Sequence, residues 1–286
     1  MAELTVSVHG ADVHVAVSGA GPPVLLLHGF PETHLTWRHV AAALAEDFRV
    51  VCPDLPGYGA SDPPAGEDTP AAYAKRATAA TMVALMRELG HDRFSVVGHD
   101  RGALVAFRAA LDHPDMVTHL GVLDVVPTVD NWAALTGAGG VFAFHLYLLA
   151  QPSDLPERMI AADPDTFFGH FLDTWTVEPL PPEVRAAYLA AARAPSAVHA
   201  ICQDYRASAF VDASHDADDR AAGRRLVMPV LAMWQDPGEV VLPFDPRRVW
   251  SDWAPDLRTQ VLPCGHFLPE ERPAEVAAAI RALVSR

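Results

Sequence analysis

Residues 97–102 read VGHDRG, and this stretch decides the fold. It lies between an apolar run expected to form a buried strand over 94–98 and a helical pattern over 101–112. Its two glycines allow a sharp turn, because glycine adopts backbone conformations that other residues avoid. The pattern matches the G-x-nucleophile-x-G elbow with Asp100 in the nucleophile's place. A simpler interpretation makes Asp100 the N-cap of the helix, so the surrounding sequence has to decide.

Strand and helix patterns alternate on both sides of this stretch. Residues 4–18 alternate polar and apolar positions around a Gly-Ala-Asp turn, which is typical of an antiparallel edge. The apolar runs that follow are typical of parallel strands covered on both faces. The pattern predicts an α/β fold with a mostly parallel central sheet. Its strands are expected at 24–27, 48–52, 94–98, 118–124, 227–234 and 257–262, and its helices at 35–46, 71–89, 101–112, 245–254 and 273–284.

The alternation stops after residue 126. Residues 127–218 carry helical patterns rich in Phe, Leu, Tyr and Trp, interrupted by prolines. We therefore expect one α/β core built from 1–126 and 219–286, with 127–218 inserted as a helical cap.

Composition excludes several classes of partner. The chain has 286 residues, 21 basic and 36 acidic side chains, and a net charge of -15. Such an acidic chain is a poor match for nucleic acid or an anionic membrane surface. The N-terminus lacks the features of a signal peptide, and no apolar run is long enough to span a bilayer. Three scattered cysteines form neither a zinc pattern nor a disulfide framework. We expect a cytoplasmic protein without metal or cofactor.

Four further residues complete a catalytic pattern with Asp100. Phe30 lies in the HGFP loop after the first core strand, where this architecture supplies one oxyanion amide, and Arg101 supplies the other. Asp124 ends the apolar run at 120–123, and His266 lies in a Gly-His-Phe loop after the last strand. The order nucleophile, acid, histidine favours a triad of Asp100, Asp124 and His266.

The acid has a rival after the next core strand. Many proteins of this architecture place it in a Trp-Gly-x-x-Asp pattern, and here residues 234–239 read WQDPGE. Gly238 occupies the expected acid position, while Asp236 and Glu239 are out of step with it. We therefore expect Asp124 to orient His266.

An aspartate at the elbow selects the reaction class. Attack by a carboxylate on an ester carbonyl would give an anhydride, so this nucleophile suits displacement at a saturated carbon, which leaves an alkyl ester on Asp100. His266 would then take a proton from water, and the water would attack the ester carbonyl carbon.

Across nearly its whole length the chain resembles the α/β-hydrolases of the dehalogenase and epoxide-hydrolase branch, and within it the fluoroacetate (haloacetate) dehalogenases. The motifs that carry the resemblance are HGFPETHLTWR at 28–38, DLPGYGASD at 54–62, GHDRGA at 98–103, VLDVVPT at 122–128, HLYLLAQP at 145–152, CQDYRA at 202–207 and GHFLPEE at 265–271. The resemblance implies a homodimer and hydrolysis of small 2-haloacids.

The resemblance also implies which residues bind the substrate. It implies that Arg101 binds the carboxylate of the haloacid, and that His145 and Tyr205 bind the departing halide. Two positions depart from the family: Leu104 stands where a second carboxylate-binding arginine is expected, and Leu146 replaces a tryptophan of the halide site. Because fluoride needs several donors, these changes favour chloro and bromo substrates over fluoro substrates.

Two alternatives remain open. An epoxide hydrolase would use the same triad with a cap phenol as the acid, for which Tyr147, Tyr188 and Tyr205 are candidates, although the first two are expected to pack in the core. A catalytically inactive hydrolase fold used for binding is the remote alternative. A dehalogenase releases halide and an epoxide hydrolase forms a diol, so the product distinguishes the two enzymes.

Overall fold

The computed structural model describes residues 1–236 and 244–286. Its described strands form one sheet in the order β1-β2-β4-β3-β5-β6-β7-β8. The pairs β1–β2 and β2–β4 are antiparallel, and the remaining pairs are parallel. The strands are β1 Ala2–Val8, β2 Ala11–Ser18, β3 Pro23–Leu27, β4 Arg49–Pro53, β5 Phe94–His99, β6 Val117–Leu123, β7 Val230–Gln235 and β8 Leu257–Leu262.

Helices connect these strands. Those of the first half are η1 His34–Trp37, α1 Arg38–Leu44, η2 Pro70–Tyr73, α2 Lys75–Glu88 and α3 Arg101–Asp112. Between β6 and β7 come α4 Thr128–Ala134, α5 Ala138–Phe142, α6 Phe144–Leu149, α7 Leu155–Ala162, α8 Pro164–Thr174, α9 Pro182–Ala192, α10 Pro195–Ala207, η3 Ser208–Asp212 and α11 Ala213–Ala221. The last are α12 Pro246–Ser251, α13 Leu268–Glu271 and α14 Pro273–Val284.

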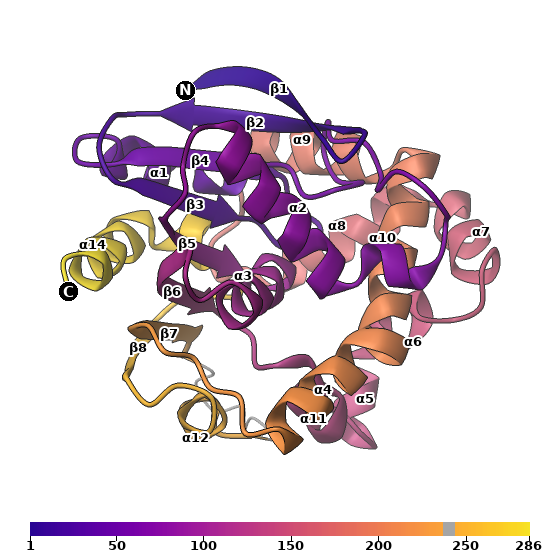
Figure 1. The fold of residues 1–286 in the computed structure, drawn as a ribbon. Coiled ribbons are helices and arrows are strands. Elements are labelled where there is room, and N and C mark those ends of the chain that lie inside the picture. The colour runs from indigo at the N-terminus through magenta and orange to yellow at the C-terminus, as the bar shows by residue number, and fades with distance from the viewer. Residues whose placement is uncertain (237–243) are drawn as a thin grey trace.

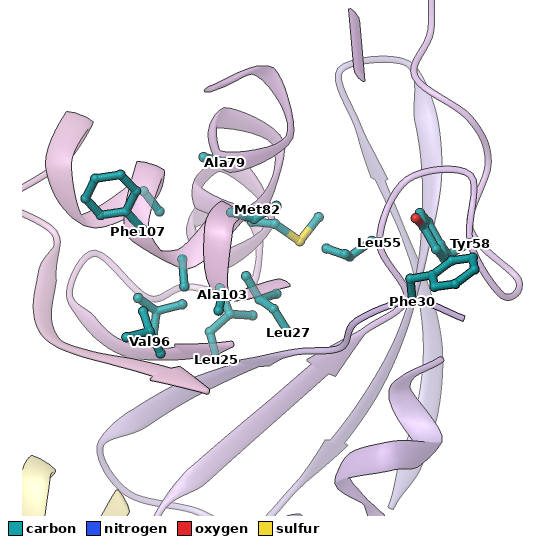
Figure 2. Close-up of a cluster of buried hydrophobic side chains, with 14 of the residues drawn as sticks. Leu25, Leu27, Phe30, Leu55, Tyr58, Ala79, Met82, Val96, Ala103 and Phe107 are labelled. Atoms are coloured by element: carbon teal, nitrogen blue, oxygen red, sulfur yellow. The ribbon is translucent and has the colours of Figure 1, made fainter. Parts of the chain in front are cut away.

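Two hydrophobic layers hold the sheet between helices. One face packs against α2 and α3, and the other packs against α1 and α14. Figure 2 shows the first layer, where Leu25 and Val96 of the strands lie beneath Ala103 and Phe107 of α3. The continuous apolar runs of the parallel strands are explained by this burial on both faces.

The helices between β6 and β7 gather at one end of the sheet (Figure 1). They occupy the stretch expected to form the cap, 127–218, and α11 continues to Ala221. Phe30, from the loop after β3, packs its buried ring against Phe168, Phe171 and Tyr205 of these helices. The site therefore lies where this helical layer meets the sheet.

The expected elements of the sheet and its flanking helices agree closely with the structure. The helices at 101–112 and 273–284 and the strand at 257–262 have the expected bounds. The helix expected at 71–89 differs, because Ala74 is extended at ψ 147° and separates the 3-10 turn η2 from α2. In the described part of the chain, no helix has the length and apolar character needed to cross a membrane.

Candidate active site

The expected site residues lie at one edge of the sheet. Phe30, Asp100, Asp124 and His266 follow the carboxyl ends of β3, β5, β6 and β8. Because parallel strands end at the same edge, residues far apart in sequence meet there, as is usual for ligand sites in α/β sheets.

The turn after β5 is as tight as its sequence suggests. Asp100 has a φ of 46°, in the left-handed region, and α3 begins at the next residue. A side-chain carbon on Gly98 would lie 2.2 Å from the carbonyl oxygen of Gly102, and one on Gly102 would lie 2.3 Å from that of His28. Larger residues at these two positions would force the turn open and displace Asp100.

Asp100 occupies the N-cap position of α3, but its side chain does not cap the helix. Its side chain makes no capping bond, and its Oδ2 instead accepts a hydrogen bond of 2.9 Å from the backbone N–H of Phe30. Oδ1 accepts no hydrogen bond from the described residues. Burial opposes ionisation of this carboxyl, but His266, His99 and Arg101 outweigh it and lower the pKa of Asp100. The part of the N-cap interpretation in which the side chain caps the helix is therefore wrong, and the side chain is an ionised carboxylate with one oxygen held.

His266 is oriented by Asp124. Its Nδ1 lies 2.6 Å from Asp124 Oδ2, and its backbone N–H donates to the carbonyl of Trp175 at 2.7 Å. Nε2 is buried and has no hydrogen-bond partner in the part of the chain that is described. A bond at Nδ1 with Nε2 left available is the arrangement that a histidine base requires.

Asp124 is itself held by a residue that sequence reasoning missed. The backbone N–H of Gln235 donates to Asp124 Oδ1 at 3.0 Å, and its side-chain amide donates to Oδ2 at 2.9 Å. Gln235 ends β7, beside β6, so its position follows from strand pairing. No local pattern in the sequence signals it.

The rival acids do not replace Asp124 in this arrangement. Asp236 donates its backbone N–H to the carbonyl of Leu262, which continues the pairing of β7 with β8. Gly238 and Glu239 lie outside the described residues. The carboxylate bonded to His266 is that of Asp124.

A second histidine lies behind the triad. The ring of His99 is fully buried, with Nδ1 2.8 Å from Glu32 Oε2 and Nε2 2.7 Å from the carbonyl oxygen of His266. Burial opposes protonation, but the Glu32 carboxylate outweighs it and raises the pKa of His99 to about 9. With both ring nitrogens facing acceptors, His99 is a cation that anchors the His266 loop and lowers the pKa of the adjacent nucleophile.

This ion pair predicts a fall in stability at alkaline pH. The pKa of His99 is raised from 6.5 to about 9 in the folded protein, so its stabilising contribution is complete below pH 6.5 and is lost as the pH rises through 9. We expect the melting temperature to fall between pH 7 and pH 10. In Glu32→Gln the melting temperature should fall less between pH 7 and pH 10 than in the wild type, as measured by thermal unfolding at a series of pH values. An equal slope in both proteins would contradict the assignment.

Arg101 is buried, with 2% of its surface exposed, and its side chain joins the core to the cap. Nε donates to Asp204 Oδ2 at 2.7 Å and Nη2 to the Asp204 carbonyl at 3.0 Å, while Nη1 makes no hydrogen bond to a described residue. Burial opposes ionisation of Asp204, but Arg101 and Lys75 lower the pKa of Asp204 to about 2. Lys75, the single lysine of the chain, also bonds to Asp204. Much of the charge of Arg101 is therefore balanced inside the protein.

Two cap side chains face the nucleophile across the cavity. His145 of α6 and Tyr205 of α10 both line it, and their rings lie 5.8 Å apart. Burial lowers the pKa of His145 to about 3 and raises the pKa of Tyr205 well above 10. Both groups are neutral at pH 7, and both can donate a hydrogen bond to a departing anion.

The other two candidate phenols point elsewhere. Tyr188 is buried and donates to Glu270, whereas Tyr147 is 39% exposed and donates to the carbonyl of Leu135 at 2.7 Å. The expected core packing is therefore found for Tyr188 and is wrong for Tyr147. Neither residue lines the cavity, which leaves Tyr205 as the cap phenol of the site among the described residues.

Trp175 is a second residue that the sequence did not single out. Its ring centroid lies 4.9 Å from that of His266 and 5.0 Å from that of His145, and it lines the cavity. It follows α8, so its approach to the triad depends on how the cap packs on the core.

A cavity of about 580 Å³ encloses these groups. Leu104 and Leu146 both line it, so the two departures from the family pattern face the substrate space. The described lining is Asp100, Arg101, Leu104, Asp124, Val125, Val126, Asn131, Leu135, Gly139, Ala143, His145, Leu146, Thr174, Trp175, Thr176, Val177, Tyr205, Trp234, Gln235, Phe244, Pro246, Gly265 and His266.

Possible metal ligands lie apart from this cavity. Glu3, His14 and His34 each offer a ligand atom, and these atoms lie within 4.8 Å of one another. None of the three lines the cavity. The chemistry available within the cavity is that of a held carboxylate, a histidine base and neutral hydrogen-bond donors.

Comparison with known proteins agrees with this architecture. Residues 22–273 match the alpha/beta hydrolase fold family, as the sequence predicted. A fluoroacetate dehalogenase from Burkholderia sp is 39% identical over 98% of this chain and 92% of its own length.

Two other relatives carry a different name. A soluble epoxide hydrolase from Corynebacterium sp. (strain C12) is 32% identical over 93% of this chain and 91% of its own length. The solved structure of a putative epoxide hydrolase from Pseudomonas aeruginosa is 43% identical, has a TM-score of 0.93, and covers 99% of this chain and 95% of its own. The relatives therefore agree on the hydrolase family and differ in the bond that they are named for.

Proposed function

Because this chain belongs to the α/β-hydrolase family, we propose that it hydrolyses small 2-haloacids through an ester on Asp100, with chloro and bromo acids better than fluoro acids. One observation carries the proposal. A single cavity is lined by an ionised carboxylate, a histidine oriented by a second carboxylate, a buried arginine and two neutral donors.

The first step is displacement at the saturated carbon that bears the halogen. Asp100 Oδ1 attacks this carbon, because Oδ2 is held by the Phe30 amide, and the carbon–halogen bond breaks. The halide leaves with the bonding electron pair. Tyr205 and His145 face the same cavity and donate hydrogen bonds to the departing anion.

The second step releases the product. His266 Nε2 takes a proton from water, and the resulting hydroxide attacks the carboxyl carbon of Asp100. The negative charge that develops on Oδ2 is already beside the Phe30 N–H, and the N–H of Arg101 is the expected second donor. The bond between the Asp100 carboxyl carbon and the substrate oxygen then breaks, and the departing oxygen takes the proton of the added hydroxyl. This frees a 2-hydroxy acid and restores the Asp100 carboxylate, and His266 releases its proton to solvent.

Leu146 supports the expected order of halides. Fluoride is the smallest and most strongly hydrated halide, so its departure needs the most hydrogen bonds. With Leu146 lining the cavity, that position offers no donor. Chloride and bromide leave more readily with the two donors that remain.

Epoxide hydrolysis is the second candidate, and two features favour it. Arg101 is paired with Asp204, so the cavity attracts an anionic substrate weakly, and Tyr205 retains the proton that an opening epoxide ring needs. A panel of fluoroacetate, chloroacetate, bromoacetate and styrene oxide separates the candidates. Halide release, fastest with bromide, supports the haloacid proposal. Diol formation without halide release would show that the enzyme hydrolyses epoxides and not haloacids. If neither kind of substrate reacts, both proposed activities are wrong.

Substitution of Arg101 tests whether the enzyme prefers an anionic substrate. We expect Arg101→Leu to raise the KM for chloroacetate by about 10- to 100-fold, because a hydrogen bond to a charged group contributes about 1.5–3 kcal/mol. The KM for neutral 2-chloroacetamide should change little, and Arg101→Lys should retain part of the preference for the acid. The readout is the ratio of the two kcat/KM values.

Leaving Asp204 without this partner will also destabilise the protein. Partial unfolding lowers the rates with chloroacetate and 2-chloroacetamide together, so it leaves their ratio unchanged. An unchanged ratio in a folded Arg101→Leu variant would remove Arg101 from substrate binding.

A further inference from the structure

We propose that the active-site cavity contains a second compartment, around Leu104 and Leu146, which binds a hydrocarbon arm of the substrate. The preferred acids would then carry an alkyl or aryl arm on the carbon that bears the halogen. This inference rests on the proposed function, because it names the substrate class of the same site.

The size of the cavity is the first argument. Cavities of roughly 300–1,000 Å³ enclose ligands of drug size, and this one measures about 580 Å³. Chloroacetate has only a handful of non-hydrogen atoms and would leave most of that space to water. A substrate that fills the cavity is therefore considerably larger than a haloacetate.

The distribution of charge is the second argument. The ionisable side chains of the described lining are Asp100, Arg101, Asp124, His145, Tyr205 and His266, all of which belong to the proposed catalytic group. The rest of the described lining includes Leu104, Val126, Leu135, Leu146 and Phe244, with no further charged side chain. A second charged group on the substrate would find no further counter-ion among the described lining residues, which favours an additional part that is uncharged and mainly apolar.

The position of Leu104 gives the arm its direction. It lies on α3 one turn after Asp100, and its backbone N–H bonds to the carbonyl of Asp100 at 3.3 Å. Leu104 and Leu146 are buried, at 3% and 4% exposed, and both contribute to the cavity lining. An arm attached to the reacting carbon would start beside Asp100 and extend across these side chains.

A chain-length series measures the compartment. We would compare both enantiomers of 2-bromopropanoate, 2-bromobutanoate and 2-bromohexanoate by bromide release, because all three acids react at a secondary carbon. Burial of each methylene contributes about 0.8 kcal/mol, so kcat/KM should rise by about fourfold per methylene until the compartment is full. We expect 2-bromohexanoate to be the best substrate of the three.

We expect Leu104→Arg to reverse the order of preference among these substrates. A guanidinium at this position would occupy the apolar space and add a second contact for a carboxylate, so kcat/KM should fall for 2-bromohexanoate and rise for 2-bromopropanoate. Leu104→Met keeps the position apolar and should retain the rising series, whatever its absolute rate. The comparison of the two variants separates loss of the compartment from general damage at this position.

Two failures are distinguishable. If wild type releases bromide fastest from 2-bromopropanoate and both enantiomers of the two longer acids are slower, the compartment is overturned and the haloacid function stands. If no acid in the series releases bromide, the proposed function fails and this inference fails with it.

Discussion

Asp100→Asn should abolish turnover, lowering the rate of halide release by about 10⁴-fold or more, the scale seen when a covalent nucleophile is removed. An asparagine has nearly the same shape and can keep the bond from the Phe30 amide, but its neutral amide is a poor nucleophile. The fold should therefore survive while the first step fails. Asp115→Asn is the matched control, because Asp115 is exposed after the end of α3.

Isotope incorporation identifies the step that is lost. In a single turnover in water enriched in heavy oxygen, hydrolysis of the ester at its carbonyl carbon places the label in Asp100 and not in the product. Trypsin cleaves after Arg93 and Arg101, so the label can be sought in the peptide 94–101. Label in the 2-hydroxy acid with an unlabelled peptide would show direct attack by water and would contradict the ester mechanism.

The core of this site could be predicted because its signals are local. The elbow needs glycine at 98 and 102 for steric reasons, and those reasons are visible in a six-residue string. Asp124 follows an apolar run and His266 follows a stretch that is expected to be extended, and strands in a parallel sheet end at a common edge. Topology alone then brings the carboxylate and the imidazole within 2.6 Å.

The supporting residues could not be predicted, because their partners are distant in sequence and ordinary in type. Gln235 meets Asp124 through pairing of β6 with β7, and Asp204 meets Arg101 across the contact between core and cap. Trp175 approaches His266 only once α8 packs on the core. Each contact depends on tertiary packing, which has no short motif.

For some residues that the sequence did identify, burial and packing give surroundings that differ from those expected. Arg101 was expected to offer its charge to the substrate, and the structure pairs that charge with Asp204. The sequence favoured Tyr205 over Tyr147 and Tyr188 as the phenol of the site, but the core packing expected of Tyr147 was wrong, because the packing of the cap decides which side chains are buried and which reach the cavity. Motifs therefore located the reacting atoms better than they located the substrate's surroundings.

His266→Ala should trap the enzyme halfway through its cycle. In this variant His99, Arg101 and the Phe30 amide still favour the ionised form of Asp100, so the displacement needs no base. Hydrolysis of the ester does need one, and loss of a general base costs about 10²–10⁴-fold in rate. We therefore expect one halide per enzyme molecule in a rapid burst, followed by very slow turnover.

The trapped ester can be detected by mass spectrometry. Intact-mass measurement after incubation with bromoacetate should show an added carboxymethyl group, and the double variant Asp100→Asn with His266→Ala should not acquire it at that position. His9→Ala is the matched control, because His9 is exposed between β1 and β2, and it should turn over without accumulating the ester. If His266→Ala loses the burst as well as turnover while remaining folded, His266 is needed for the displacement itself, and the division of labour between Asp100 and His266 is wrong.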